Sequence, residues 1–158
     1  LDDHNVITDG MGISLAALFA EDSSTRSVSD FTIGYIQLGT SSLLMTSSVD
    51  SLLVPLTLAE YGNSELTVAD YLISTGSTEA LISINSAYVT KPTLSKVSYT
   101  VLISDDACNG ENLSEIGLFS VNPLGTPTPV SFLCAYRTFS PIAKTESFSL
   151  TFRWTLEF

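Results

Sequence analysis

The C-terminal stretch decides the fold; it reads Phe148-Ser149-Leu150-Thr151-Phe152-Arg153-Trp154-Thr155-Leu156-Glu157-Phe158. Large apolar side chains occupy every second position, and polar or charged side chains occupy the positions between them. Because successive side chains of a β-strand point to opposite faces, this alternation predicts a strand with one buried face and one face in water. We therefore expect Trp154 to lie in the core.

Further strands are expected upstream of this stretch. In residues 97–103, alternate apolar side chains share one face: Val97, Tyr99, Val101 and Ile103. Asn109-Gly110 is typical of a tight hairpin turn, so residues 114–120 are expected to return beside residues 97–103. Residues 122–129 are rich in proline and are expected as a loop, because proline cannot donate to a sheet ladder. Residues 130–136 are the next expected strand.

The first half of the chain predicts one helix and less regular strands. Residues 8–20 place four apolar side chains on one helical face, which we expect to be buried: Met11, Leu15, Leu18 and Phe19. Thr8 is the expected N-cap. Residues 31–38 are apolar on both faces, as in a central strand, and residues 40–51 are a Ser/Thr-rich loop. Short strands are expected over residues 52–58, 66–73 and 81–84, with a helix over residues 56–61 as the alternative to the first.

These segments predict a mainly β protein with one domain over residues 1–158. One early helix followed by about seven short strands favours an antiparallel β-sandwich, jelly-roll or immunoglobulin-like, with the N-terminal α-helix packed on it.

Charge and hydropathy narrow the classes of partner. The net charge is −11, with 6 basic and 17 acidic residues, so phosphate backbones and anionic membrane surfaces are repelled and neither nucleic acid nor membrane is an expected partner. No apolar run is long enough for a spanning helix, and no secretion signal is visible at the start of the sequence. Hydrophobic residues make up 44% and charged residues 15%, a low charge density that favours multiple copies or covering neighbours.

Few residues have the spacing that catalysis or metal binding requires. The one histidine, His4, lies beside Asp2 and Asp3, which favours a solvated tail over a catalytic triad or a metal site. Residues 105–111 resemble a calcium loop in part, but the distal acid is misplaced, and a plain Asn-Gly hairpin is favoured. Cys108 and Cys134 form either a disulfide or two buried thiols. We expect no catalytic residue, cofactor or metal, and no enzyme activity.

Four segments together resemble bacteriophage virion proteins related to the N-terminal attachment domain of tail-collar fibres. They are residues 6–18, residues 31–40, residues 113–119 with Gly125 shortly after, and residues 137–145 running into residues 148–158. The third segment contains the motif Glu115-Ile116-Gly117-Leu118-Phe119. Residues 41–95 match nothing in that family, and no fibre shaft follows. The resemblance implies a non-enzymatic structural component of a tailed-phage virion, at the tail, collar or baseplate or in fibre attachment. Such a protein is made in the host cytoplasm and assembles with other virion proteins and with copies of itself; host receptor contact is left open.

Three other functions are considered beside this one. The first is a capsid decoration or cement protein of the same kind of particle. A bacterial surface or pilus-like adhesin domain would be favoured by a secretion signal and a Cys108–Cys134 bond. A carbohydrate-binding sandwich or hydrolase would need exposed aromatic clusters or paired carboxylates, which the sequence does not offer.

The expected functional residues are structural and interfacial. In the Glu115–Phe119 motif we expect the apolar side chains to enter the core and Gly117 to allow a close backbone approach. Glu115 is either solvated or bonded to backbone, or paired with Arg137 or Lys144. The two loops supply the interface candidates, which are Leu43, Leu44, Met45, Pro123, Pro127 and Pro129. Residues 43–45 either contact another chain or tuck under their own domain.

Overall fold

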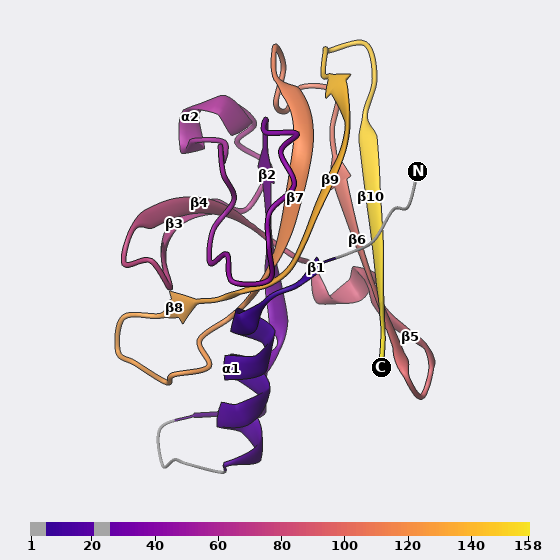
Figure 1. Ribbon diagram of the computed structural model, residues 1–158. Helices are drawn as coiled ribbons and strands as arrows, with labels where there is room; N and C mark the ends of the chain where they lie inside the picture. Colours follow the sequence, from indigo (N-terminus) through magenta and orange to yellow (C-terminus); the bar gives the residue numbers. More distant parts are fainter. Residues whose placement is uncertain (1–5, 21–25) are drawn as a thin grey trace.

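The computed structural model describes residues 6–20 and 26–158, and in these residues the protein is mainly β (Figure 1). The helices are α1 (Asp9–Phe19) and α2 (Leu58–Tyr61), with 3₁₀ turns at Val28–Phe31 and Ser86–Tyr88. The ten strands are β1 (Val6–Ile7), β2 (Ile33–Gly39), β3 (Val68–Ile73), β4 (Thr78–Ser83), β5 (Val89–Thr93), β6 (Lys96–Ile103), β7 (Asn112–Ser120), β8 (Val130–Ser131), β9 (Leu133–Ala143) and β10 (Leu150–Glu157).

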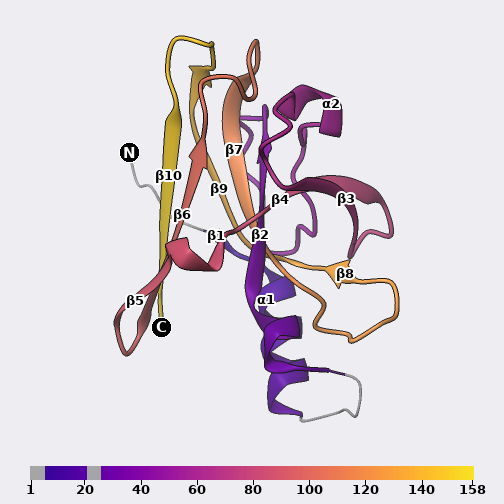
Figure 2. The ribbon, with the colours of Figure 1, turned by 180° about the vertical axis from the view of Figure 1, so that it is seen from behind.

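The strands form two sheets. The larger has seven strands in the order β1-β9-β7-β2-β4-β3-β8, and the smaller has three in the order β10-β6-β5. Neighbours are antiparallel except β3 and β8, which pair in parallel. The expectation of a purely antiparallel fold is therefore wrong for the large sheet, which is mixed. Seen from the front and from behind, the small sheet stands beside the large one, with β10 at its rim (Figures 1 and 2).

One buried cluster draws side chains from both sheets. The large sheet contributes Ile36, Leu38, Ile116 and Leu118 among others, and the small sheet contributes Tyr99, Val101, Trp154 and Leu156. Trp154 is 6% exposed, so the predicted register of the last strand is confirmed. A second cluster lies on the opposite face of the large sheet; it contains Leu52, Ile73, Leu81, Phe119, Leu133 and Tyr136.

Helix α1 begins after Thr8, as predicted, but buries a different face. Of the four apolar residues expected in the core, only Met11 is buried, whereas Leu15, Leu18 and Phe19 are exposed. Gly10 decides the contact face, because a Cβ there would clash with the Leu133 carbonyl oxygen on β9. The helix backbone thus packs directly on the strand, which turns the longer side chains outward.

The predicted Asn-Gly hairpin is wrong. Strand β6 pairs with β10 and β5, whereas β7 pairs with β2 and β9, so residues 104–111 cross from the small sheet to the large one. The crossing bends at Cys108 and Gly110, whose φ angles are 56° and 92°. A two-residue turn would keep β6 and β7 paired in one sheet. The longer connection lets β6 join the small sheet and β7 join the large one.

The middle of the chain follows the alternative interpretation. Residues 52–58 make only an isolated bridge, from Pro55 to Gly39, and α2 forms where a short helix was the alternative. Thr57 and Glu60 form a capping box, in which the Glu60 carboxylate accepts the Thr57 N–H at 2.6 Å. Those hydrogen bonds from Thr57 lower the pKa of Glu60. Strand β5 was not predicted; it contains Pro92, which is atypical of a strand interior.

Candidate assembly surfaces

The Glu115 side chain is completely buried and ties a long loop to the large sheet. Its Oε1 accepts backbone N–H groups from Ser41 (3.2 Å) and Val54 (2.8 Å), and its Oε2 accepts the Leu53 N–H at 3.1 Å. Charge-assisted bonds from backbone N–H groups stabilise a carboxylate inside a protein. Of the two alternatives for Glu115, the backbone-bonded one is confirmed. One carboxylate therefore anchors both ends of residues 41–54.

Two glycines make room for this arrangement. Gly39 lies opposite Glu115 in the β2–β7 register, and a Cβ on it would overlap the carboxylate. Gly117 faces Leu52, Leu133 and Phe119, and a Cβ there would come within 2.7 Å of the Leu133 side chain. The close approach expected at Gly117 is confirmed. In the Glu115–Phe119 motif, Ile116, Leu118 and Phe119 are all buried, as predicted.

The anchored loop holds two leucines in solvent. Leu43 is 64% and Leu44 85% exposed, whereas Met45 packs against the second buried cluster. The Tyr136 hydroxyl donates to the Leu43 carbonyl at 2.8 Å, which fixes the backbone beneath these side chains. Burial, and next the nearby Glu115, raise the pKa of Tyr136 to about 12. Leu43 and Leu44 therefore do not tuck under their own domain, and Met45 does.

The proline-rich loop is organised by Asn122. The Asn122 side chain donates to the Thr126 carbonyl at 3.0 Å and accepts the Val130 N–H at 3.2 Å. Pro123 is buried beneath this turn, whereas Pro127 and Pro129 are exposed. Two of the three prolines thus remain accessible to a partner, on a backbone that is held by internal hydrogen bonds.

Helix α1 also exposes an apolar surface. Leu15, Leu18 and Phe19, which were expected in the core, are exposed, and so is Ile13. A hollow of about 470 Å³ lies between this helix and the end of β10, lined by Met11, Leu15 and Leu156 among others. Helical spacing predicts which side chains share a face but not which face packs on the sheet. The sequence signal for the packing face is Gly10, because a residue without a side chain lets strand β9 approach the helix backbone.

A buried lysine occupies the middle of the loop that resembles a calcium site. The Lys144 ammonium donates to the Asp105 carbonyl (3.0 Å), to Asn109 Oδ1 (3.0 Å) and to the Thr145 carbonyl (2.8 Å). Two of these three oxygens belong to residues 105–111, so the Lys144 ammonium occupies polar groups of this loop. The alternative that paired Lys144 with Glu115 is wrong. Within residues 6–20 and 26–158, no group of three or more His, Cys, Asp or Glu side chains could hold a metal ion.

Cys108 and Cys134 are free, buried thiols, so the disulfide alternative is wrong. Burial raises the pKa of Cys108 to about 11 and also raises that of Cys134. Both stay protonated at neutral pH, and neither has the thiolate that a nucleophile requires. His4 lies outside the described residues.

No helix in the described part of the chain is long and apolar enough to cross a membrane. Comparisons of the sequence and the structure with models of protein families, with curated proteins and with solved structures found no significant match.

Proposed function

We propose that this protein is a non-enzymatic structural component of a tailed-phage particle, and that it acts through contacts with other virion proteins and with copies of itself. The observation that carries the proposal is the pair Leu43 and Leu44. Two large apolar side chains stand in solvent on a loop whose backbone is tied down by Glu115 and Tyr136. An apolar group on a fixed backbone loses little conformational entropy on binding, as an assembly contact requires.

The resemblance to the attachment domain of tail-collar fibres supports the same role. The motif that carries it, Glu115 to Phe119, is used here to build the surface from which the loop projects. Within this role we propose a sandwich of jelly-roll or immunoglobulin-like type. The buried cluster shared by the two sheets favours that arrangement. The protein would be made in the host cytoplasm and reside in the virion, and a decoration protein on the head is the alternative position.

The experiment compares the incorporation of variants at the exposed loop leucines, Leu43 and Leu44, with that of a variant at an exposed leucine elsewhere. Leu44→Ser and the double change Leu43→Ser with Leu44→Ser should leave the melting temperature unchanged and reduce the number of copies in purified particles. Leu94→Ser is the matched control, since Leu94 is 95% exposed on the β5–β6 turn. Quantitative mass spectrometry of gradient-purified particles gives the copy number, and electron microscopy with labelled chain gives its position at the tail or head.

Two results contradict the proposal. If the wild-type chain is absent from purified particles, the virion role is wrong. If Leu94→Ser reduces incorporation as strongly as Leu44→Ser, the anchored loop is not the contact. Met45 is left unchanged in these variants because it packs on the protein's own core, and its removal would lower stability.

A further inference from the structure

The free edges of the two sheets are protected unequally. In the large sheet, β1 and β8 have only two residues each, and β9 carries Pro141 beyond its pairing with β1. In the small sheet, β5 carries Lys91, Pro92 and a register shift. Short strands, proline, lysine and irregular register are the features that block edge-to-edge pairing. Strand β10 has eight residues, no proline or glycine and an unbroken register with β6.

The outer edge of β10 presents a regular row of backbone groups. The Phe158 N–H donates to the Ser95 carbonyl on the β6 side, at 2.9 Å. Because backbone groups alternate between the two edges of a strand, the N–H and C=O groups of Thr151, Arg153, Thr155 and Glu157 point away from β6. No described strand pairs with them. Figures 1 and 2 show β10 running along one side of the molecule, with the β5 hairpin reaching past its C-terminal end.

We propose that a second copy of this chain pairs with this edge, strand β10 antiparallel to β10, with Thr155 opposite Thr155. In this register Arg153 of each copy lies opposite Glu157 of the other, which gives two symmetry-related ion pairs. Centring the pair on Arg153 instead would oppose two like charges, which destabilises a sheet. The two small sheets then form one continuous six-stranded sheet across the two-fold axis.

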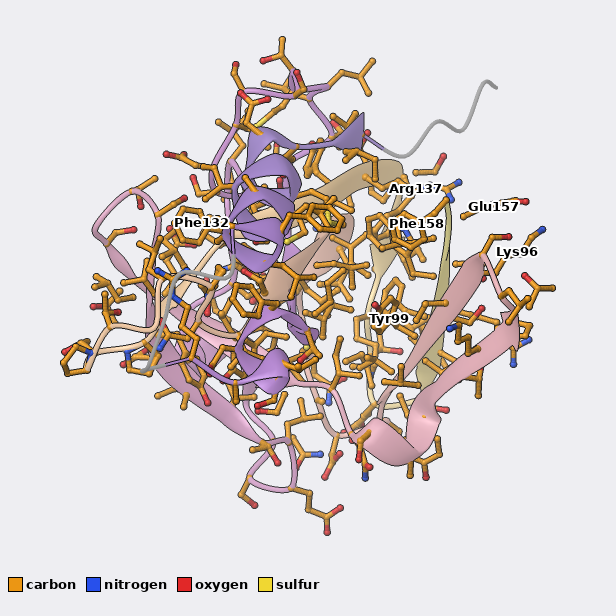
Figure 3. The ribbon with its side chains drawn as sticks, turned by 90° about the horizontal axis from the view of Figure 1, so that it is seen from below. Lys96, Tyr99, Phe132, Arg137, Glu157 and Phe158 are labelled. Carbon is orange, nitrogen blue, oxygen red and sulfur yellow. The ribbon has the colours of Figure 1, made fainter. Side chains whose placement is uncertain are left out.

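The charges along β10 favour this partner. Glu157 is already held by Lys96 at 3.0 Å in the next strand, and Figure 3 shows the two side chains together at the rim of the small sheet. In the pair, Glu157 therefore lies between Lys96 of its own chain and Arg153 of the second copy. Positive and negative side chains therefore alternate across the joined sheet, and each copy supplies all three charged residues of this row. A self-complementary patch is what a two-fold interface requires.

Apolar side chains on the inner face match in the same register. Trp154 lies opposite Leu156 of the second copy, and Phe152 lies opposite Phe158, which is 71% exposed in the single chain. A hollow of about 330 Å³, lined by Phe139, Phe152 and Trp154, opens beside this edge between β9 and β10. Aromatic and aliphatic cross-strand pairs stabilise a sheet. The pairing thus covers the exposed Phe158 ring.

Charge reversal tests the register on the purified chain. Arg153→Glu places Glu opposite Glu157, and Glu157→Arg places Arg opposite Arg153, so each variant alone should raise the dimer dissociation constant about tenfold or more. Mixing the two variants restores both ion pairs, and the mixture should form heterodimers at the wild-type concentration. Lys91→Glu, the same charge change on the opposite edge strand, is the control and should dimerise normally. Sedimentation equilibrium measures all four samples.

Hydrogen exchange supplies a second readout that needs no variant. The amides of Arg153, Thr155 and Glu157 should gain protection as the protein concentration rises through the dissociation constant. A chain that stays monomeric at millimolar concentration, or a mixture of the two variants that does not pair, overturns the proposal. A dimer that Arg153→Glu leaves unchanged also overturns it, since the contact then lies elsewhere. The inference does not depend on the virion role, because loss of particle incorporation in Leu44→Ser leaves this dimer intact.

Discussion

At the scale of single residues, Glu115 has the largest consequence for the surface that we propose to be functional. It is buried, and its carboxylate satisfies three backbone N–H groups from residues more than sixty positions away in sequence. The sequence alone is consistent with two alternatives for this residue. Spacing could not separate them, because the partners are backbone groups of a loop without regular structure, and no side-chain pattern marks such groups.

Replacing Glu115 by alanine should therefore destabilise the protein. Three backbone N–H groups in one buried and two partly buried hydrogen bonds lose their acceptor, and each group left unsatisfied away from water costs about 1–3 kcal/mol, so we expect a loss of about 2 kcal/mol or more. Urea unfolding measures it. Glu60→Ala, which removes a carboxylate from an exposed capping box, is the control and should cost about 1 kcal/mol. A loss at position 115 no larger than at position 60 would show that the loop is held by other contacts.

At the scale of elements, the alternation of apolar residues correctly predicted the buried face of the strands, whereas helical spacing did not predict the buried face of the helix. Strands β6 and β10 were predicted with the correct face, because period two leaves only two choices and one of them buries the apolar side. Helix α1 was predicted in the correct place with the wrong face, because Gly10 rather than apolar bulk selects the contact. Asn109-Gly110 predicted a turn between paired strands, but turn chemistry alone does not reveal that the two strands belong to different sheets.

The two glycines of α1 give a matched test of this explanation. Alanine is a better helix former than glycine by about 1 kcal/mol, and a Cβ on Gly12 meets open space, so Gly12→Ala should stabilise the protein by roughly that amount. Gly10→Ala should destabilise it despite the same gain, because its Cβ clashes with the Leu133 carbonyl. Thermal melting of both variants measures the difference. An equal shift in both would mean that the helix does not pack on β9 through Gly10.

At the scale of the whole molecule, burial of thiol and phenol groups predicts how stability depends on pH. Burial raises the pKa of Cys108 from 9.0 to about 11 and that of Tyr99 from 10.0 to about 12. The unfolded chain therefore releases protons that the folded chain retains, and the free energy of unfolding should fall as the pH rises from about 9 to about 12. Urea unfolding at pH 7, 9 and 11 checks this. A constant or rising stability over that range would contradict the burial of these groups.

The position of β6 between β5 and β10 has a consequence for protein synthesis. Strand β6 leaves the ribosome well before β10, because all of β7, β8 and β9 lie between them in the sequence. Until β10 is translated, the small sheet is a two-stranded hairpin whose apolar face, including Tyr99, Val101 and Ile103, has no Trp154 to cover it. The nascent chain must therefore carry a hairpin with an uncovered apolar face while residues 104–149 are synthesised. Chaperones that recognise extended apolar segments should bind residues 97–103 on stalled ribosomes and be released when Trp154 emerges.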